Sequence, residues 1–264
     1  MAEPGRLLGE GRTATVHEFD ERRVIKVLRP GFPESLLRRE AEATRAAVAA
    51  GVSAPKVHDL ERVGDRPGIV LDRIAGDSMV DLIIANLERV EHWARLLAET
   101  HADVLTHTTS DLMDVGDVLR AKIKHAKSLS RRQRRAALHA LKTLPGGNSL
   151  LHGDFHPLNV FVTDNDVVTI DWSDASRGPP AGDIARTTWL ISPNAIPPDF
   201  PGRDRLIDAV DRFGSVYSEE IMKRVAIQKA DVEAWSLPVL AGRLSEEIEW
   251  EIEPILQRID KLIA

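Results

Sequence analysis

The order of hydrophobic and polar positions divides the chain into a first third with strand-like periodicity and a remainder with mainly helical periodicity. In the first third, short β-branched runs separated by turn residues indicate strands. One helical stripe, opened by Pro33 and Glu34 and ended by Gly51, interrupts them. The expected order is three strands, a helix and two strands, typical of a twisted antiparallel sheet. The strands are expected at residues 6–8, 13–19, 24–28, 56–62 and 68–74.

The rest of the chain has the periodicity of amphipathic helices, with one β-hairpin among them. We expect helices at residues 87–106, 115–127 and 131–144, and again from Ala181 onward. The hairpin is expected over residues 160–170, where an Asp-Asn-Asp turn joins two β-branched runs.

The change of pattern near Ala75 predicts two lobes. Residues 1–74 would form a small β-rich, nucleotide-binding lobe. Residues 75–264 would form a larger helical lobe with the catalytic loop and the acceptor site. Ligands commonly bind in the cleft between two such lobes.

Composition narrows the class of protein. Apolar residues make up 43% and charged residues 29%, which is ordinary for a globular domain. No apolar stretch approaches the ~20 residues of a membrane span, so we expect no membrane partner and a cytoplasmic location. Cysteine is absent, which excludes disulfides and thiolate metal sites.

Net charge narrows the class of partner. The value of −6 argues against nucleic acid as an obligatory partner. The basic segment 118–149 has nine Lys or Arg and no acid, and is best interpreted as a solvated helical hairpin. Nothing in the sequence predicts an oligomeric state.

Two features of the first third suggest a phosphate site. Gly9 and Gly11 lie in a turn between two expected strands, and glycine lets backbone N–H groups approach phosphate oxygens. Such a turn is also common in ordinary hairpins. Lys26 lies inside an apolar strand and could neutralise phosphate charge, or could face water at a sheet edge. Glu40, preferred over Glu42, could pair with it from the next helix.

The most informative segment reads Leu-His-Gly-Asp-Phe-His-Pro-Leu-Asn-Val over residues 151–160. Asp154 and Asn159 are five positions apart on a loop that Pro157 keeps from being helical. Asp171 follows at the end of the hairpin. A carboxylate can orient a substrate hydroxyl, and amide and carboxylate oxygens are ligands that Mg²⁺ prefers.

Two other interpretations concern the same region. His152, Asp154 and His156 could form a zinc site, but no cysteine or further well-spaced ligand supports it. Asp183 opens a helix, where a first-turn acid is favoured by the helix dipole. Its carboxylate could also hold the loop backbone around His152.

In this order, the segments resemble the aminoglycoside phosphotransferase and choline kinase-like family, relatives of the protein kinases. The resemblance covers nearly the whole chain and rests mainly on His-Gly-Asp-Phe-His-Pro-x-Asn followed by Ile-Asp-Trp. It implies an α+β, two-lobed protein-kinase-like fold, with a small antiparallel sheet lobe containing one helix and a larger, mainly helical lobe. It also implies a small-molecule kinase that uses ATP and Mg²⁺ to phosphorylate a hydroxyl.

The resemblance assigns roles to individual residues. Lys26 would contact ATP phosphates and Glu40 would orient it. Asp154 would position the substrate hydroxyl or accept its proton, and Asn159 and Asp171 would be the metal ligands. The other nucleotide-binding positions that it implies, partly through backbone groups, are Gly9, Gly11, Leu71, Asp72, Arg73 and Ile74.

Competing functions remain open at this point. A non-catalytic pseudokinase would be expected to lack at least one of Lys26, Asp154, Asn159 and Asp171, yet all four are present. A compact bacterial protein kinase is opposed by length, because only eleven residues separate Asp171 from Asp183 and leave no peptide-docking segment. A small acceptor is therefore favoured.

The acceptor is the least defined part of this prediction. Acceptors in this family are often cationic, and an antibiotic and a hydroxylated metabolite are both compatible with the sequence. A helix expected over 242–253 would carry Trp250 near Glu246, Glu247 and Glu253, which could form a cation-binding face. The alternative, a solvated acidic face with one packing tryptophan, is favoured by the pattern.

Overall fold

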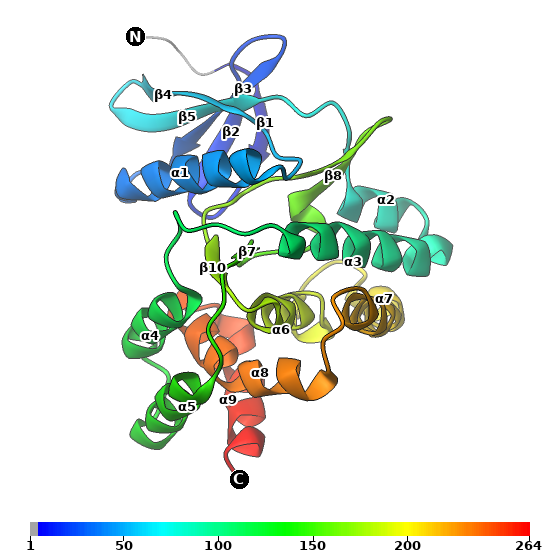
Figure 1. Cartoon of the computed structure of the whole chain (residues 1–264). Helices are drawn as coiled ribbons and strands as arrows, with labels where there is room; N and C mark the ends of the chain where they lie inside the picture. The colour runs from blue at the N-terminus through cyan, green and yellow to red at the C-terminus, as the bar shows by residue number, and fades with distance from the viewer. Residues whose placement is uncertain (1–4) are drawn as a thin grey trace.

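The N-terminal part of the chain folds into a five-stranded antiparallel sheet with the order β1-β2-β3-β5-β4 (Figure 1). The structure is a computed structural model and describes residues 5–264. The predicted order of three strands, a helix and two strands is confirmed. The strands are β1 (Leu7–Glu10), β2 (Ala14–Glu18), β3 (Arg23–Leu28), β4 (Val57–Val63) and β5 (Arg66–Asp72).

The single helix of this lobe, α1 (Ser35–Ala50), packs on one face of the sheet. It ends at Gly51, whose φ of 99° is a left-handed conformation that glycine adopts without strain. Leu37 and Ala41 on α1 meet Leu28, Ile69 and other residues of the sheet in a common buried cluster. Burial of a side chain such as Leu37 stabilises the lobe by about 1.5–3 kcal/mol.

A short connection leads from β5 into the second lobe. β6 (Asp77–Ser78) follows it and pairs with β8 (Val160–Val162). A Cβ at Gly76 would lie 2.4 Å from the Val162 carbonyl oxygen, so this close approach of two backbones requires glycine. The connection is thereby fixed against the strand that follows the predicted catalytic loop.

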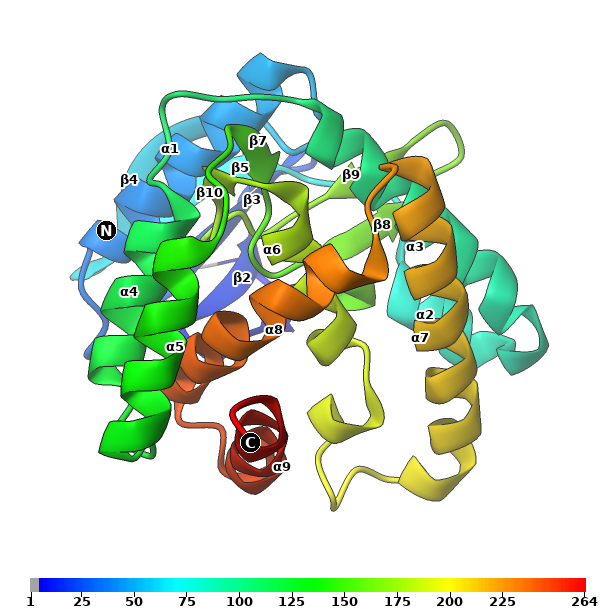
Figure 2. The ribbon, with the colours of Figure 1, turned by 60° about the horizontal axis from the view of Figure 1, so that its bottom comes forward.

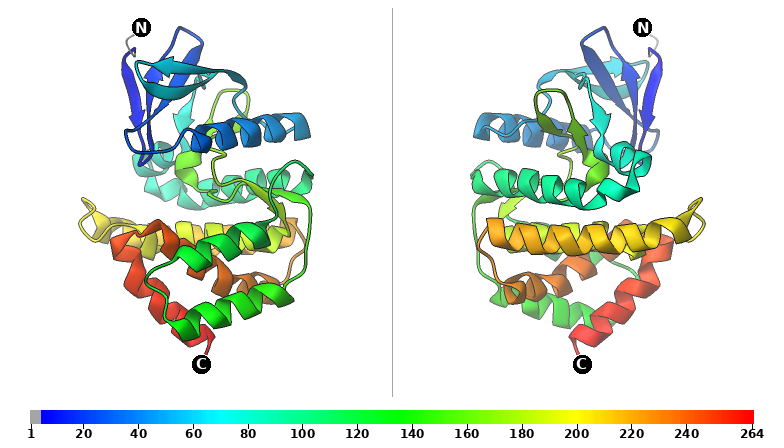
Figure 3. Two further views of the ribbon diagram at one scale, coloured as in Figure 1. Left: turned by 90° about the vertical axis from the view of Figure 1, so that its left-hand side faces the viewer. Right: turned by 90° about the vertical axis from the view of Figure 1, so that its right-hand side faces the viewer.

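The second lobe is mainly helical, as predicted (Figure 2). Figure 3 shows α1, α3 and α7 in successive layers below the sheet. One buried cluster surrounds Leu97 and Tyr217, and another surrounds Ile123 and Ile255. The helices are α2 (Met79–Ala85), α3 (Val90–Thr106), α4 (Val115–His125), α5 (Arg131–Thr143), α6 (Pro180–Leu190), α7 (Arg203–Arg224), α8 (Lys229–Arg243) and α9 (Glu249–Leu262).

Short strands frame the functional loops. The predicted hairpin is present as β8 and β9 (Val167–Thr169), and β6 extends it to three strands. A second pair, β7 (Ser149–Leu151) and β10 (Ser176–Gly178), was not predicted. These two pairs flank the loop that contains Asp154 and the segment that contains Asp171.

The prediction of one continuous helix over 242–253 was wrong. Helix α8 ends at Arg243, and a 3-10 turn, Leu244–Glu246, follows. Glu247 then has a φ of 54°, a left-handed conformation that an α-helix cannot contain, and α9 begins at Glu249. The acidic residues of this segment therefore belong to different elements.

Among the described residues, no helix combines the length and the apolar character needed to cross a membrane.

Candidate active site

The Gly-rich turn leaves open space around its glycines. The Gly11 N–H donates to the Ala14 carbonyl oxygen over 2.8 Å, and the Arg29 Nε donates to the Gly11 carbonyl oxygen over 2.9 Å. A Cβ added at Gly9 would meet no protein atom within 4 Å, and one added at Gly11 would meet only the Ala14 oxygen, at 3.5 Å. The fold itself thus gives no reason for glycine at these positions, whereas a ligand close to the backbone would.

Lys26 projects from β3 toward the second lobe. Its Nζ lies 2.8 Å from Oε1 of Glu40 and 3.0 Å from Oδ1 of Asp171, so the predicted pairing with Glu40 is present. The side chain is only 13% exposed, which rejects the alternative of an edge lysine facing water. Burial lowers the pKa of the Lys26 ammonium, but the two carboxylates outweigh this effect and raise the pKa above its usual value. Lys26 is therefore a fixed, charged cation.

Asp183 holds the backbone of the loop before Asp154. Its Oδ2 accepts a hydrogen bond from the His152 N–H over 2.7 Å, and its Oδ1 accepts one from the Gly153 N–H over 2.9 Å. The Nε2 of His101 on α3 lies 3.2 Å from Oδ2. The interpretation of Asp183 as support for the loop is confirmed.

The His152 ring is fully buried and both of its nitrogens are used. The Ile170 carbonyl oxygen lies 3.0 Å from Nε2, which must therefore donate, while Nδ1 accepts from the Asp154 N–H over 3.2 Å. Burial lowers the pKa of His152, so the ring is neutral. No lone pair is left for a metal, and no group of three metal-binding His, Cys, Asp or Glu occurs within residues 5–264. The zinc alternative is rejected.

The Asp154 carboxylate is ionised and partly open to solvent. Its side chain is 26% exposed. Oδ2 lies 3.2 Å from His156 Nε2, and Oδ1 lies 3.4 Å from Nη2 of Arg186. Burial raises the pKa of Asp154, but the hydrogen bond from His156 and the nearby positive charges outweigh it and hold the pKa well below its usual range. Asp154 can therefore accept a hydrogen bond from a ligand.

Asn159 and Asp171 supply oxygens that suit a divalent cation. The Ile170 N–H donates to the Asn159 carbonyl oxygen over 2.9 Å, which brings the two residues together. The Asn159 Nδ2 donates to the Asp154 carbonyl oxygen over 2.9 Å, and no described group donates to its Oδ1. Oδ1 of Asp171 is buried and has Lys26 Nζ at 3.0 Å, but it accepts no well-directed hydrogen bond. Mg²⁺ prefers oxygen ligands, so the Asn159 amide oxygen and the Asp171 carboxylate could bind it, with phosphate and water oxygens as the remaining ligands.

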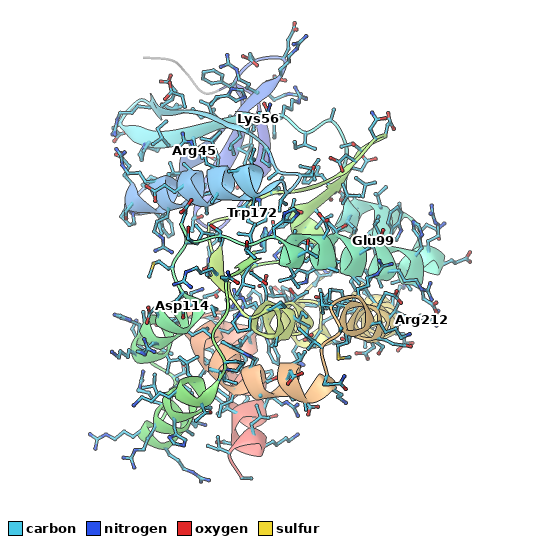
Figure 4. The ribbon with its side chains drawn as sticks, in the orientation of Figure 1. Arg45, Lys56, Glu99, Asp114, Trp172 and Arg212 are labelled. Atoms are coloured by element: carbon cyan, nitrogen blue, oxygen red, sulfur yellow. The ribbon has the colours of Figure 1, made fainter. Side chains whose placement is uncertain are left out.

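Asp171 itself has an unusual backbone conformation. Its φ is 61°, which is uncommon for a residue with a side chain. The next residue, Trp172, is fully buried between the two lobes (Figure 4), 4.6 Å from the His152 ring. Its Nε1 donates to the Thr169 carbonyl oxygen over 3.0 Å. Strained backbone conformations of this kind concentrate at functional sites.

Two residues of the predicted adenine-contacting segment, Asp72 and Arg73, have backbone N–H groups that already donate within the protein, and the Asp72 N–H donates to the Lys56 carbonyl oxygen over 3.1 Å. Leu71 pairs with Val24 in the sheet and faces the same side as Lys26. The Arg73 N–H donates to the Arg22 carbonyl oxygen over 2.8 Å, so it is satisfied within the sheet. In the part of the chain that the structure describes, the Ile74 N–H has no such partner.

Arg186 is a site residue that the sequence analysis missed. Its Nε donates to the Gly153 carbonyl oxygen over 2.9 Å, and its Nη2 donates to Oε1 of Glu246 over 2.8 Å. One signal was available. Arg186 lies three positions after Asp183 on α6, and residues at that spacing share a helix face.

The expected cation-binding face does not assemble. Glu246 forms ion pairs with arginines, and Glu247 lies 2.7 Å from Nζ of Lys127. Glu253 accepts a hydrogen bond from Gln257. The Trp250 Nε1 donates to the Ala195 carbonyl oxygen.

Comparison with the sequences of known protein families identifies the family. The sequence model of the phosphotransferase enzyme family matches residues 5–209, which is more than half of the chain. The chain belongs to this family. No curated protein sequence matches this phosphotransferase family member.

Solved structures similar to this phosphotransferase family member have the same fold. A thermostable mutant of the aminoglycoside phosphotransferase APH(4)-Ia, with AMP-PNP and hygromycin B, has 16% identity and a TM-score of 0.68. That alignment covers 98% of this chain and 92% of the other. Amicoumacin kinase hAmiN has 14% identity and a TM-score of 0.61, with coverages of 97% and 86%. A choline/ethanolamine kinase family protein from Mesorhizobium loti has 17% identity and a TM-score of 0.55, with coverages of 98% and 88%.

Proposed function

We propose that this protein is a kinase that transfers the γ-phosphoryl group of ATP to a hydroxyl of a small molecule. The observation that carries the proposal is the meeting of Lys26 from the sheet lobe with Asp171 from the helical lobe, over 3.0 Å. Asn159 and Asp154 adjoin this pair through the hydrogen bonds of the loop. A cation, two metal-binding oxygens and an ionised carboxylate thus converge, which is what phosphoryl transfer requires.

The two lobes would share the substrates. Residues 1–74 would bind the nucleotide, with Gly9 and Gly11 over the phosphates and Lys26, oriented by Glu40, against them. The adenine would lie near the Leu71 side chain. Since the Asp72 and Arg73 N–H groups already donate within the first lobe, the Ile74 N–H is the better placed backbone donor. Residues 75–264 would bind the acceptor.

Asn159 and Asp171 would hold Mg²⁺, which when bound neutralises charge on the phosphate oxygens. The side chains of Lys26 and Asp154 would add further charge neutralisation and orient the acceptor. Lys26 would place a second positive charge at the phosphates. Asp154 would accept a hydrogen bond from the acceptor hydroxyl and align it with the γ-phosphorus. Asp154, held ionised by His156 and Arg186, would orient the hydroxyl and receive its proton as the new phosphorus–oxygen bond forms and the bond to ADP breaks.

The segment between Asp171 and Asp183 supports a small acceptor. It contains only eleven residues, and its strand β10 pairs with β7. A Cβ at Gly178 would lie 2.4 Å from Val115 on α4, so this segment packs closely against the helical lobe. The backbone of this segment is thus paired and packed within the protein and is not available to bind a peptide substrate. This disfavours the protein kinase alternative.

The variant Asp154→Asn tests the proposal. ADP release would be measured with Mg·ATP alone and with a panel of hydroxylated small molecules. We expect turnover to fall about 10²–10⁴-fold while ATP binding, measured by calorimetry, is retained. Asp199→Asn, at an exposed position, is the matched control and should behave like the wild type. Wild-type turnover in Asp154→Asn would refute the role of Asp154, and a wild type that binds no Mg·ATP would refute the proposed function.

A further inference from the structure

Near Asp154, the carboxylate of Glu246 is surrounded by positively charged side chains from four separate elements. Nη2 of Arg186 on α6 lies 2.8 Å from Oε1 of Glu246, and Arg243 on α8 pairs with its Oε2. Lys122 on α4 and Arg12 in the Gly-rich turn each lie 3.7 Å from the carboxylate. The side chain of Glu246 is only 11% exposed.

The other carboxylates of the cluster are also neutralised from within the protein. Oδ1 of Asp174 lies 2.7 Å from Nζ of Lys122. Glu251 accepts hydrogen bonds from Nε and Nη2 of Arg243 over 2.8 and 2.6 Å, and from the Trp189 indole over 2.7 Å. A cationic acceptor would have to displace these pairs to reach a carboxylate, and breaking a buried pair is strongly unfavourable.

With the ionised Asp154 counted, the positive and negative side chains of the cluster balance. The positive side chains are Arg12, Lys122, Arg186 and Arg243, and the negative ones are Asp154, Asp174, Glu246 and Glu251. An anionic ligand would therefore have to replace an existing contact of one of the four cations.

The Arg186 guanidinium is fixed and incompletely paired. Its side chain is 9% exposed, and its Nε and Nη2 are held by the Gly153 carbonyl oxygen, by Glu246 and by Asp154. Within residues 5–264, its Nη1 has no hydrogen-bond partner. Arg186 also lines a small hollow together with Lys122, Gly153 and others. A guanidinium held on one side, with free N–H groups on the other, is suited to a carboxylate or a phosphate.

Arg12 meets the cluster from the other lobe, at Glu246. Its side chain is 60% exposed, and among residues 5–264 its hydrogen bond to the second lobe, 3.2 Å to the backbone oxygen of Glu246, and its 3.7 Å ion pair both involve Glu246. Glu246 has stronger partners in Arg186 and Arg243. Arg12 is therefore free to exchange this contact for one with a ligand.

We propose that the acceptor carries an anionic group, a carboxylate or a phosphate, close to its reacting hydroxyl, and that Arg186 and Arg12 bind this group. The inference rests on the proposed kinase function and specifies its substrate class. It predicts discrimination against polycationic acceptors at the same hydroxyl.

The test is binding to the full-length protein saturated with Mg·AMP-PNP, so that the nucleotide phosphates are already in place. The probes form a series with one carbon skeleton: glycerol, 3-amino-1,2-propanediol, glycerate and glycerol 3-phosphate, with a parallel series from glucose. Affinities are measured by calorimetry at matched ionic strength. We expect an acidic member to bind at least tenfold more tightly than its neutral and cationic analogues, and the two acidic probes distinguish carboxylate from phosphate.

Variants then locate the site. Arg12→Gln, at an exposed position, should weaken binding of the acidic probe to the AMP-PNP-saturated protein about tenfold without affecting folding, and AMP-PNP affinity is measured alongside because Arg12 follows Gly11. Arg186→Gln should abolish the preference, and Arg186→Lys, which retains the charge, should restore part of it. The matched control Arg45→Gln lies on an exposed face of α1 (Figure 4) and should have no effect.

Several outcomes would overturn the proposal. These are equal or absent binding across the charge classes, tighter binding of the cationic probe, and equal effects of Arg12→Gln and Arg45→Gln. In each case the kinase assignment would still stand. A wild type that fails to bind Mg·AMP-PNP would instead refute the proposed function.

Discussion

The Asp183 carboxylate anchors the backbone that leads to Asp154, and asparagine at this position tests how much that anchor stabilises the protein. The carboxylate accepts hydrogen bonds from the backbone N–H groups of His152 and Gly153, over 2.7 and 2.9 Å. His101 Nε2 lies 3.2 Å away. The side chain is only 1% exposed, so water cannot replace a lost partner.

The magnitude follows from the hydrogen-bonding capacity of the two side chains. Asparagine has nearly the same volume, but only one of its two terminal atoms can accept a hydrogen bond. One backbone N–H therefore loses its partner, which costs about 1–3 kcal/mol, and the other exchanges a charged acceptor for a neutral one, at about 1 kcal/mol more. We expect Asp183→Asn to lower the free energy of unfolding by about 2–4 kcal/mol. The corresponding fall in Tm is about 5–15 °C.

The assay is urea denaturation near neutral pH, followed by tryptophan fluorescence. Asp199→Asn, which alters an exposed side chain by the same chemical change, should shift the free energy of unfolding by less than about 0.5 kcal/mol. Below its Tm, Asp183→Asn should also release ADP more slowly, because the displaced loop carries Asp154. ATP affinity should change little, since Lys26 lies on the other lobe.

The effect of Asp183→Asn should also depend on pH. Burial raises the pKa of Asp183, but hydrogen bonds from His101 and the Gly153 N–H, with nearby positive charge, outweigh it and hold the pKa below its usual value. The carboxylate therefore contributes stability above the unfolded pKa of about 3.9 and loses it as the pH falls below that value. The difference between wild type and variant should be constant near neutral pH and shrink in acid. Destabilisation below about 1 kcal/mol, or a difference that grows in acid, would refute the anchoring role.

Three further predictions concern the same site. Lys26→Met leaves the Glu40 carboxylate buried without a cation, and we expect kcat for ADP release to fall about 10²–10³-fold in steady-state assays; an unchanged kcat would exclude Lys26 from the chemistry. Gly153 has a φ of 78°, and a Cβ there would lie 2.2 Å from the Asp174 carbonyl oxygen. Gly153→Ala should therefore lower the free energy of unfolding by about 2 kcal/mol or more, and a neutral result in urea denaturation would contradict this. Burial lowers the pKa of His152, which must bind a proton on unfolding in acid. The urea midpoint should fall as the pH drops below about 6.5, and a flat profile down to about pH 5 would show that His152 does not contribute.

The parts of the fold that the sequence predicted are those with a strong local signal. The strands of the first lobe are short β-branched runs bounded by turn residues, and α1 has a clear stripe ended by Gly51. The pairing of Lys26 with Glu40 was predictable because the order of strand and helix places them on facing elements. The Asp154–Asn159 loop was recognisable from its residues and Pro157.

The strands β6, β7 and β10 lacked such a signal. Each has only two or three residues, which is too short for periodicity to appear, and, unlike the equally short β8 and β9, none is joined to its partner by a local turn. Their pairing is decided by contacts between segments far apart in the chain, such as Leu151 with Ser176. Gly76 shows the same limit, because it is required by the approach of Val162, which no local pattern reveals.

The acidic segment after α8 shows why acceptor chemistry was harder to predict than the fold. In the sequence, Glu246 and Glu247 belong to an acidic run that suggests attraction for a cation. In the structure, the left-handed Glu247 separates the run into two elements, and Glu246 is neutralised by Arg186, sixty positions earlier. The charge that a ligand meets depends on such long-range pairs rather than on local composition. At this site they leave the guanidinium of Arg186 incompletely paired, and the proposal of an anionic group on the acceptor rests on this long-range arrangement, which the local sequence does not reveal.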